Sequence, residues 1–370
     1  MSPMNQTEIF YTLSLLQIPG IGSLLARKLM ERFGGAEAVF KAGKPKLATT
    51  PGIGTLLANT ILKSNPFPTA EKELKLVDKH GLELLHYQEE DFPMRLRQCA
   101  DHPLILFGKG ELPVNANRIV AIVGTRSATD YGRRLTEELV RGLTALNVMV
   151  LSGLAYGIDV HAHRMALQMD LPTVGVLGHG LGRIYPASHR QIAEKMIEKG
   201  GLLTEFLYDI APDKENFPKR NRIVAGMTDA VVVIEAATNG GALITASLAN
   251  DYNRDVFAYP GKVHDKYSEG CHKLVRSNRA ALITSAEDFC EAMGWGVPIP
   301  MSSSRQGLLF PELEIDEQLV YDLLKTQQQM GIDHLSMQTL LSTSKLSNVL
   351  LGLEFKNMIR ALPGKQYQAL

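Results

Sequence analysis

Short apolar runs alternate with amphipathic stretches through the middle of the chain. The runs lie at residues 118–124, 148–152, 172–178, 201–206, 230–236, 255–260 and 280–284. Stretches between them, such as 131–146, carry apolar residues at helical spacing. Nearly continuous apolar strands separated by helices indicate a mostly parallel sheet covered on both faces, with right-handed crossovers. The pattern therefore predicts an α/β domain over residues 67–295.

The first 66 residues have a helical pattern that contains an internal repeat. Ile18–Gly22 and Thr50–Gly54 each place a Gly-x-Gly turn before a helix. This is the pattern of a helix-hairpin-helix in a SAM-like helical domain, where amides at a helix N-terminus can face a phosphate. Basic residues near the turns are few (Arg27, Lys28 and Lys63). DNA contact and packing against protein alone both remain open.

The end of the chain differs from the middle. Residues 296–313 are rich in Pro and Ser and are predicted to form a linker. Residues 314–370 show three short helical patterns and a last apolar strand after a Pro-Gly turn, which predicts a winged-helix domain. Its third helix offers only Lys345 and Lys356 as cations. Contact with the DNA major groove and contact with protein therefore both remain open.

Composition restricts the classes of function. The 370 residues contain 39 Lys and Arg and 39 Asp and Glu. This balance argues against wrapping long DNA by bulk charge but leaves room for a local basic cleft. The three cysteines form no CxxC pair, so neither a disulfide framework nor a zinc site is expected. With no secretory signal and no membrane-spanning run, the expectation is a cytoplasmic protein that does not bind membranes.

Candidate binding residues follow several of the predicted strands. In open parallel sheets, ligands bind beyond the carboxyl ends of the strands, near helix N-termini. Glycines there let the backbone approach a phosphate, and Arg126 adds a permanently charged, planar group. The extended Rossmann-like sheet is therefore predicted to bind phosphates at one edge. The candidates in these loops are Gly124, Thr125, Arg126, Ser152, Gly153, Gly240 and Gly241.

A further cluster follows strand 201–206. It contains the cationic and amide side chains Lys219, Arg220, Asn221 and Arg222, which are candidate phosphate ligands, and Phe217, a candidate for base stacking. Lys219 and Arg222 share a helix face at i,i+3. An aromatic ring beside clustered cations suits a single strand, whose phosphates need charge and whose bases need a stacking surface. A solvated helix start with Phe217 in the core is the alternative explanation.

Other nucleotide-binding folds fit less well. The first turn reads GTRSATDYG, so Arg126 stands where a dinucleotide site needs its second glycine. The second strand ends VMVLSG, without an acidic residue to hold a ribose hydroxyl. No GxxxxGK[ST] motif is present, which argues against a P-loop motor.

Catalytic and metal sites are not predicted. Glu205 and Glu235 lie near strand ends and could do acid/base chemistry, but pairing with Arg126 or Arg222, or capping of loops, is favoured. Asp159, His161 and His163 have the composition of a metal cluster, yet only Asp159 and His163 share a helix face. No cofactor and no catalytic residue is expected.

The same residues resemble those of the DNA-processing protein A family (DprA, also called Smf). The matching stretches are ADHPLILFGKG, AIVGTR, LSGLAYGIDVHAHRMAL, TVGVLGHGLGRIYP, GLLTEF, FPKRNRIVAGMTDAVVVIEA, GGALITASLA and VFAYPG, and they run from about residue 91 to 284. Residues 353–367 also resemble the family's winged-helix ending. The resemblance implies single-stranded DNA binding at the sheet edge, a homodimer, and loading of the RecA recombinase onto incoming DNA during natural transformation.

Carried over by motif, the family's phosphate site falls on Gly124, Thr125 and Arg126, and its basic segment on residues 217–222. Two positions depart from the family pattern. Gly240-Gly241-Ala242 stands where Ser-Gly-Ser is usual, and His272 replaces a common Asn. These departures leave the donors at those positions open.

Two other functions compete with DNA binding. The first is a Rossmann-type nucleotide N-glycosidase, whose PGGxGTxxE motif would correspond to TNGGALITAS, which is followed by no catalytic Glu. The second is a scaffold that contacts only proteins through its terminal domains. A test for free base released from nucleoside monophosphates distinguishes the first from DNA binding, and nucleic-acid retention distinguishes the second.

Overall fold

The chain forms two compact units, Met1–Ile299 and Pro300–Leu370. The computed structural model describes residues 3–296, 313–327, 329–356, 358–362 and 366–369. Within these ranges, no helix is both long and apolar enough to span a bilayer. Apart from its two end residues, the predicted linker 296–313 lies outside the described residues. The domain boundaries expected at residues 66 and 295 stay predictions.

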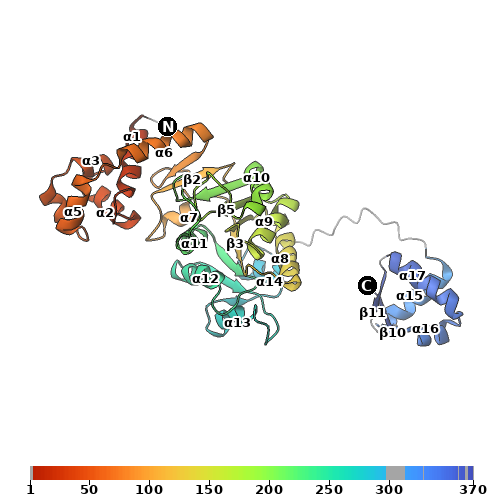
Figure 1. Ribbon diagram of the computed structural model, residues 1–370. Helices are drawn as coiled ribbons and strands as arrows, with labels where there is room; N and C mark the ends of the chain where they lie inside the picture. The colour runs from red at the N-terminus through yellow and green to blue at the C-terminus, as the bar shows by residue number, and fades with distance from the viewer. Residues whose placement is uncertain (1–2, 297–312, 328, 357, 363–365, 370) are drawn as a thin grey trace. The chain divides into compact units, whose positions relative to one another are not determined.

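A nine-stranded sheet organises the first unit, in the order β1-β2-β6-β5-β4-β3-β7-β8-β9. Figure 1 shows its strands β3 and β5 between the helices labelled α9 and α11. The seven strands from β6 to β9 in this order are parallel. Each of them coincides with one of the predicted apolar runs, which confirms the α/β prediction. These strands are β3 (Ile119–Val123), β4 (Met149–Ser152), β5 (Thr173–Val176), β6 (Gly200–Thr204), β7 (Ala230–Val233), β8 (Asp255–Ala258) and β9 (Ala281–Leu282).

Two further strands were missed by the sequence pattern. β1 (Glu83–His86) and β2 (Ile105–Lys109) extend the sheet beyond β6 as antiparallel neighbours. Register pairs Phe107 of β2 with Thr204 of β6. They connect through a loop and the single turn α7 (Met94–Arg97) rather than through a long crossover helix. The strand-then-helix pattern that revealed the parallel strands is therefore absent here.

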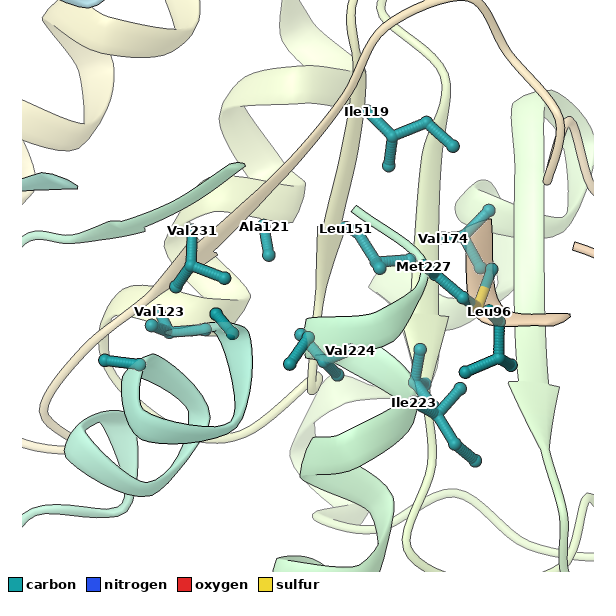
Figure 2. Close-up of a cluster of buried hydrophobic side chains, with 14 of the residues drawn as sticks. Leu96, Ile119, Ala121, Val123, Leu151, Val174, Ile223, Val224, Met227 and Val231 are labelled. Carbon is teal, nitrogen blue, oxygen red and sulfur yellow. The ribbon is translucent and has the colours of Figure 1, made fainter. Parts of the chain in front are cut away.

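Side chains of the central strands alternate between two helical layers. Ile119, Ala121 and Val123 of β3 pack with Ile223 and Val224 on one face, as Figure 2 shows. The residues between them on β3 pack against the opposite layer. The first layer contains α7, α11 (Asn216–Gly226), α12 (Gly241–Asp251) and α13 (Glu269–Arg276). The second contains α8 (Asp130–Gly142), α9 (Ile158–Gln168) and α14 (Ala286–Ala292). α10 (Arg190–Lys199) packs beside β5 and β6.

The N-terminal segment consists of helices. Its two predicted glycine turns support each other: a Cβ on Gly20 would lie 2.9 Å from Leu57 Cδ2, and one on Gly52 would lie 3.0 Å from Leu25 Cδ2. Both glycines have left-handed φ, +85° and +91°. The assignment to a helix-hairpin-helix module stays a prediction. The helices are α1 (Pro3–Leu16), α2 (Ser23–Phe33), α3 (Ala36–Lys41), α4 (Lys44–Ala48), α5 (Gly54–Lys63) and α6 (Phe67–His80).

This helical segment packs on the β1–β2 end of the sheet. Ile9 and Leu13 of α1 share an apolar cluster with Leu84 and Ile105 of these strands. Arg27 of α2 donates to the carbonyl of Ala100 at 2.7 Å and lies 2.7 Å from His102 Nε2. The helices are thereby fixed close to the loops that lead into β2.

The described residues of the second unit form three helices and a three-stranded sheet of order β10-β12-β11. Its apolar cluster includes Val320, Leu335 and Leu350. Both cations of its third helical region are engaged with the first helix: Lys345 pairs with Asp316 at 2.6 Å and Lys356 with Glu317 at 2.5 Å. The elements are α15 (Ile315–Gln327), β10 (Gln329–Gly331), α16 (Ile332–Thr339), α17 (Thr343–Phe355), β11 (Ile359–Leu362) and β12 (Gln366–Ala369). The predicted Pro-Gly turn lies outside the described residues.

Candidate nucleic-acid interface

A cavity of about 610 Å³ opens at the carboxyl edge of the parallel sheet. It lies beyond the ends of β3, β4 and β7. Strand order reverses between β3 and β7, since β4 and β5 follow on one side and β8 on the other. Such a reversal leaves a crevice between diverging crossovers, which is where ligands bind in open α/β sheets.

The cavity brings together four segments that are far apart in the sequence. They are the loops after β3, β4 and β7 and the first turns of α11. The sequence had predicted that these segments meet at one edge, and the structure places them there. The predicted residues that line the cavity are Gly124, Thr125, Arg126, Gly153, Phe217, Arg220, Asn221, Gly240 and Gly241.

Arg126 presents a free guanidinium at the cavity. Its Cζ lies 5.5 Å from the centroid of the Phe217 ring, so charge and ring are stacked. The Phe217 ring in turn lies 6.1 Å from that of Tyr185, which is 49% exposed. Among the described residues, Arg126 has no hydrogen-bond or ion-pair partner. Its donors therefore remain available to an anion.

Arg220 occupies the same cavity wall but is enclosed. Only 5% of the residue is exposed, and Nη1 donates to the carbonyl of Gly153 at 2.6 Å and to that of Val176. Burial lowers the pKa of the guanidinium to about 10, while the charge of Asp159 acts in the opposite direction. The side chain of Arg220 supports the cavity wall, and its predicted phosphate contact stays a prediction.

Asp159 and Gly153 complete this enclosed wall. Burial raises the pKa of the Asp159 carboxyl, and the charge of Arg220 opposes this shift. The carboxylate accepts a hydrogen bond from the amide of Gly153 at 3.2 Å. A Cβ on Gly153 would lie 2.3 Å from the Arg220 guanidinium. The glycine at 153 is thus required by packing within the protein, which differs from the predicted reason for it.

At position 241, packing within the protein does not require a glycine. A Cβ at this position would meet nothing within 4 Å, and α12 starts here after Gly240, which provides no side-chain cap. The first amides of a helix have no partner within the helix. This side of the cavity therefore leaves open space next to unpaired backbone donors.

Three predicted phosphate ligands lie elsewhere. Ser152 is fully buried and donates to the carbonyl of Ile122 at 2.6 Å. Lys219 and Arg222 line a different cavity, on the face of α11 that carries neither Phe217 nor Asn221. The expectation of one continuous cluster from 217 to 222 is corrected, because an α-helix turns these side chains to different sides.

The two glutamates near the strand ends are engaged in the fold. Glu205 pairs with Arg222, as the favoured interpretation held, and burial raises the pKa of its carboxyl. Glu235 is 2% exposed and accepts from Thr129, at 3.0 Å from its amide and 2.5 Å from its hydroxyl. Neither side chain lines the cavity.

The histidines after β4 also have structural partners. His163 Nδ1 lies 2.7 Å from Thr173 Oγ1, and His161 Nε2 lies 3.1 Å from Glu137. Across the described ranges, no group of three or more His, Cys, Asp and Glu side chains could hold a metal ion.

Sequence reasoning missed Tyr185 and Lys214, which both line the cavity. Tyr185 comes from the long loop after β5, and Lys214 from the loop before α11. The rule that pointed to the other loops applied here as well, because β5 ends at the same edge of the sheet. Because Tyr185 lies far along the chain from the end of β5, the sequence pattern did not point to it.

Comparison with known proteins decides the family. The family model described as DNA recombination-mediator protein A matches residues 83–294, more than half of the chain, and the model of the DprA winged helix domain matches residues 310–365. The chain belongs to the DprA/Smf family. Both the resemblance found in the sequence and the winged-helix prediction are confirmed.

Relatives agree over most of the chain. The Smf protein of Synechocystis sp. is 31% identical and covers 99% of this chain and 100% of its own length. The solved structure of DprA from Streptococcus pneumoniae matches with a TM-score of 0.67 at 30% identity, over 76% of this chain and 97% of that one. DprA from Helicobacter pylori, whose structure is described as showing a single-stranded DNA binding mode, matches with a TM-score of 0.53 at 27% identity, over 58% of this chain and 96% of that one.

Proposed function

We propose that this chain binds single-stranded DNA in the cavity at the carboxyl edge of its sheet. The observation that carries the proposal is the unpaired guanidinium of Arg126 stacked over Phe217 at the cavity. A single strand needs cations for its phosphates and aromatic faces for its exposed bases. The Helicobacter pylori relative described as binding single-stranded DNA supports this ligand.

The residues that face the open space of the cavity have separate roles in this proposal. Arg126 contacts a phosphate, since its planar donors match phosphate oxygens. Gly240 and Gly241 let the backbone approach the strand, and Gly241 presents the first amide of α12. Phe217 and Tyr185 provide the surfaces on which bases stack. None of these contacts reads base edges, so weak sequence dependence is expected.

We propose no chemical step at this site. Glu205 and Glu235 are held by Arg222 and Thr129, away from the cavity. The rival N-glycosidase needs a glutamate in the helix after its glycine turn. α12 reads GALITASLAND and contains none. The alternative therefore lacks its acid/base group.

The wider role extends from the family. The family is described as a DNA recombination mediator. We propose that the chain holds a single strand and loads RecA onto it during natural transformation, and that it does so as a homodimer. Family membership alone supports the proposals of RecA loading and of a homodimer, whereas the proposed DNA site is supported by the cavity residues described above.

A salt-titrated binding assay with single-stranded and duplex oligonucleotides tests the site. Arg126→Ala is expected to weaken single-strand binding by about 2 kcal/mol, roughly 30-fold, because one charged hydrogen-bonding group is lost. The slope of log K against log salt should decrease by about 0.7. Arg164→Ala, at an exposed position on α9, serves as the matched control. An unchanged dissociation constant in a folded Arg126→Ala protein would rule this site out.

A further inference from the structure

A second cavity lies on the other side of α11 and is not used by the site above. Its volume is about 400 Å³, and it is lined by residues of α1 and α2 from the helical segment and of β2 and the 205–210 loop from the sheet. Lys219 and Arg222 provide its cations. Leu104, Phe107 and Phe206 are among its apolar lining residues. Cations beside apolar surface are the chemistry that the first cavity offers to a single strand.

A third hollow lies further along α2, beyond Ser23 of the second. Its volume is about 490 Å³, and Arg27, Lys28 and Arg97 line it together with Tyr87. Within one short chain segment, His102 lines the third hollow, and Pro103 and Leu104 line the second. Arg222 donates to the carbonyl of Asp101 at 2.7 Å, and Arg27 to that of Ala100 at 2.7 Å. The cations of the two hollows are thus anchored on consecutive residues.

The charge along these hollows is unbalanced although the whole chain is neutral. Glu205 and Glu31 are the acidic residues that line them. Glu205 is paired with Arg222, and Glu31 lies 3.8 Å from Arg27. Lys28 and Lys219 are exposed, and no hydrogen bond or ion pair holds either of them among the described residues. A neutral protein with a local excess of cations attracts a polyanion to that surface alone.

We propose that the bound single strand leaves the Arg126 cavity, crosses the start of α11 over Pro218 and Lys219, and continues along α2 to Lys28 and Arg97. Pro218 lines the first cavity and Lys219 the second, so adjacent residues connect the two. This inference rests on the proposed function and assigns the helical segment a part in it. The occupant is an unpaired strand, because paired bases could not reach the apolar walls and Tyr87.

The test compares a short oligonucleotide of about 6 nucleotides with a long one of about 16, the range of known single-strand site sizes. The variant Ser23→Glu/Lys28→Glu places two negative charges in the second and third hollows. Ser23 is the first residue of α2, where an acidic side chain is favourable to the helix. We expect about tenfold weaker binding of the long oligonucleotide and a smaller salt slope, with equal binding of the short one.

Controls separate this inference from the proposed function. Thr69→Glu/Lys75→Glu makes the same charge change at two exposed positions on α6 that line neither hollow, and this variant should bind both lengths normally. If Arg126→Ala weakens both lengths while Ser23→Glu/Lys28→Glu changes neither, the path along α2 is overturned and the first cavity stands. If Arg126→Ala has no effect on either length, the proposed function itself fails.

Cross-linking gives a second readout. A 5-iodouracil scanned along the long oligonucleotide should cross-link near Tyr185 or Phe217 at some positions and to Tyr87 at positions toward one end. Cross-links confined to the first cavity at every position would overturn the path, even in a protein that binds normally.

Discussion

The two sides of the Arg126 cavity contain similar residues, but those on one side are bonded within the protein while those on the other are open to a ligand. The closed wall consists of Gly153, Asp159 and Arg220, whose polar groups are engaged with other groups of the protein. The open wall consists of Arg126, whose guanidinium has no partner among the described residues, and Gly241, where an added Cβ would meet nothing within 4 Å. Each wall has an arginine and a glycine, so residue type does not distinguish them. Burial and hydrogen-bond partners distinguish the two walls. They show which groups maintain the cavity and which groups can bind a ligand.

Substituting the closed wall's arginine should have the largest effect. Arg220→Ala is expected to destabilise the protein by about 3–5 kcal/mol, because Asp159 and two carbonyls lose their buried partner. Urea unfolding followed by circular dichroism measures the change. Arg126→Ala should leave the free energy of unfolding within about 0.5 kcal/mol. Equal stability losses for the two variants would remove the distinction between the walls.

Acid should destabilise the protein through His163, a buried side chain that feels the charge of Arg220 in the closed wall. Thr173 Oγ1 donates to the carbonyl of Val150, so it accepts from Nδ1 of His163, while Nε2 has no partner among the described residues. Burial lowers the pKa of His163 to about 3. Below about pH 6.5, the imidazole is protonated in the unfolded chain but stays neutral in the folded protein. The free energy of unfolding therefore decreases as the pH is lowered through this range. Between pH 7 and 5, this residue should account for about 2 kcal/mol.

His163→Gln isolates that contribution. The variant should be less stable at pH 7, yet it should lose about 2 kcal/mol less than the parent between pH 7 and 5. Other buried histidines such as His86, whose pKa is lowered to about 4, remain in both proteins and cancel in the comparison. Parallel stability curves for parent and variant would show that His163 does not titrate as a buried, neutral group.

A matched pair of glycine substitutions gives the finest test of the two walls. Gly153→Ala should destabilise by about 1–3 kcal/mol, because its Cβ would press on the Arg220 guanidinium, which the surrounding carbonyls hold in place. Gly241→Ala should be neutral or stabilise by up to about 1 kcal/mol, since it meets no protein atom at the start of a helix. The same Gly241→Ala protein should nevertheless bind single-stranded DNA more weakly. Thermal unfolding and the oligonucleotide assay on both variants measure the contrast.

Sequence was sufficient for what depends on short-range pattern. The seven parallel strands follow from apolar runs such as 118–124 and 230–236, and the meeting of their loops follows from parallel topology. The placement of Lys219 and Arg222 away from Phe217 also follows from helical geometry, since positions i+2 and i+5 do not share a face with position i.

Other features depend on contacts that no local pattern contains. The burial of Arg220 requires the carbonyls of Gly153 and Val176, which lie 67 and 44 residues away in the chain. In the sequence, Arg220 is indistinguishable from a solvated cation at a helix start. The antiparallel strands β1 and β2 lacked a helix between them that would have marked their ends. The roles of Tyr185 and Lys214 required the course of two long loops.

The reciprocal packing of the glycine turns has a consequence for how the N-terminal helices hold together. Gly20 lies against Leu57, and Gly52 lies against Leu25, so the glycine turn of each repeat packs on a leucine of the other repeat. A side chain added at either glycine would press on a leucine of the other repeat. The segment therefore behaves as one interlocked element, whose halves are expected to melt together and to tolerate change only in compensating pairs.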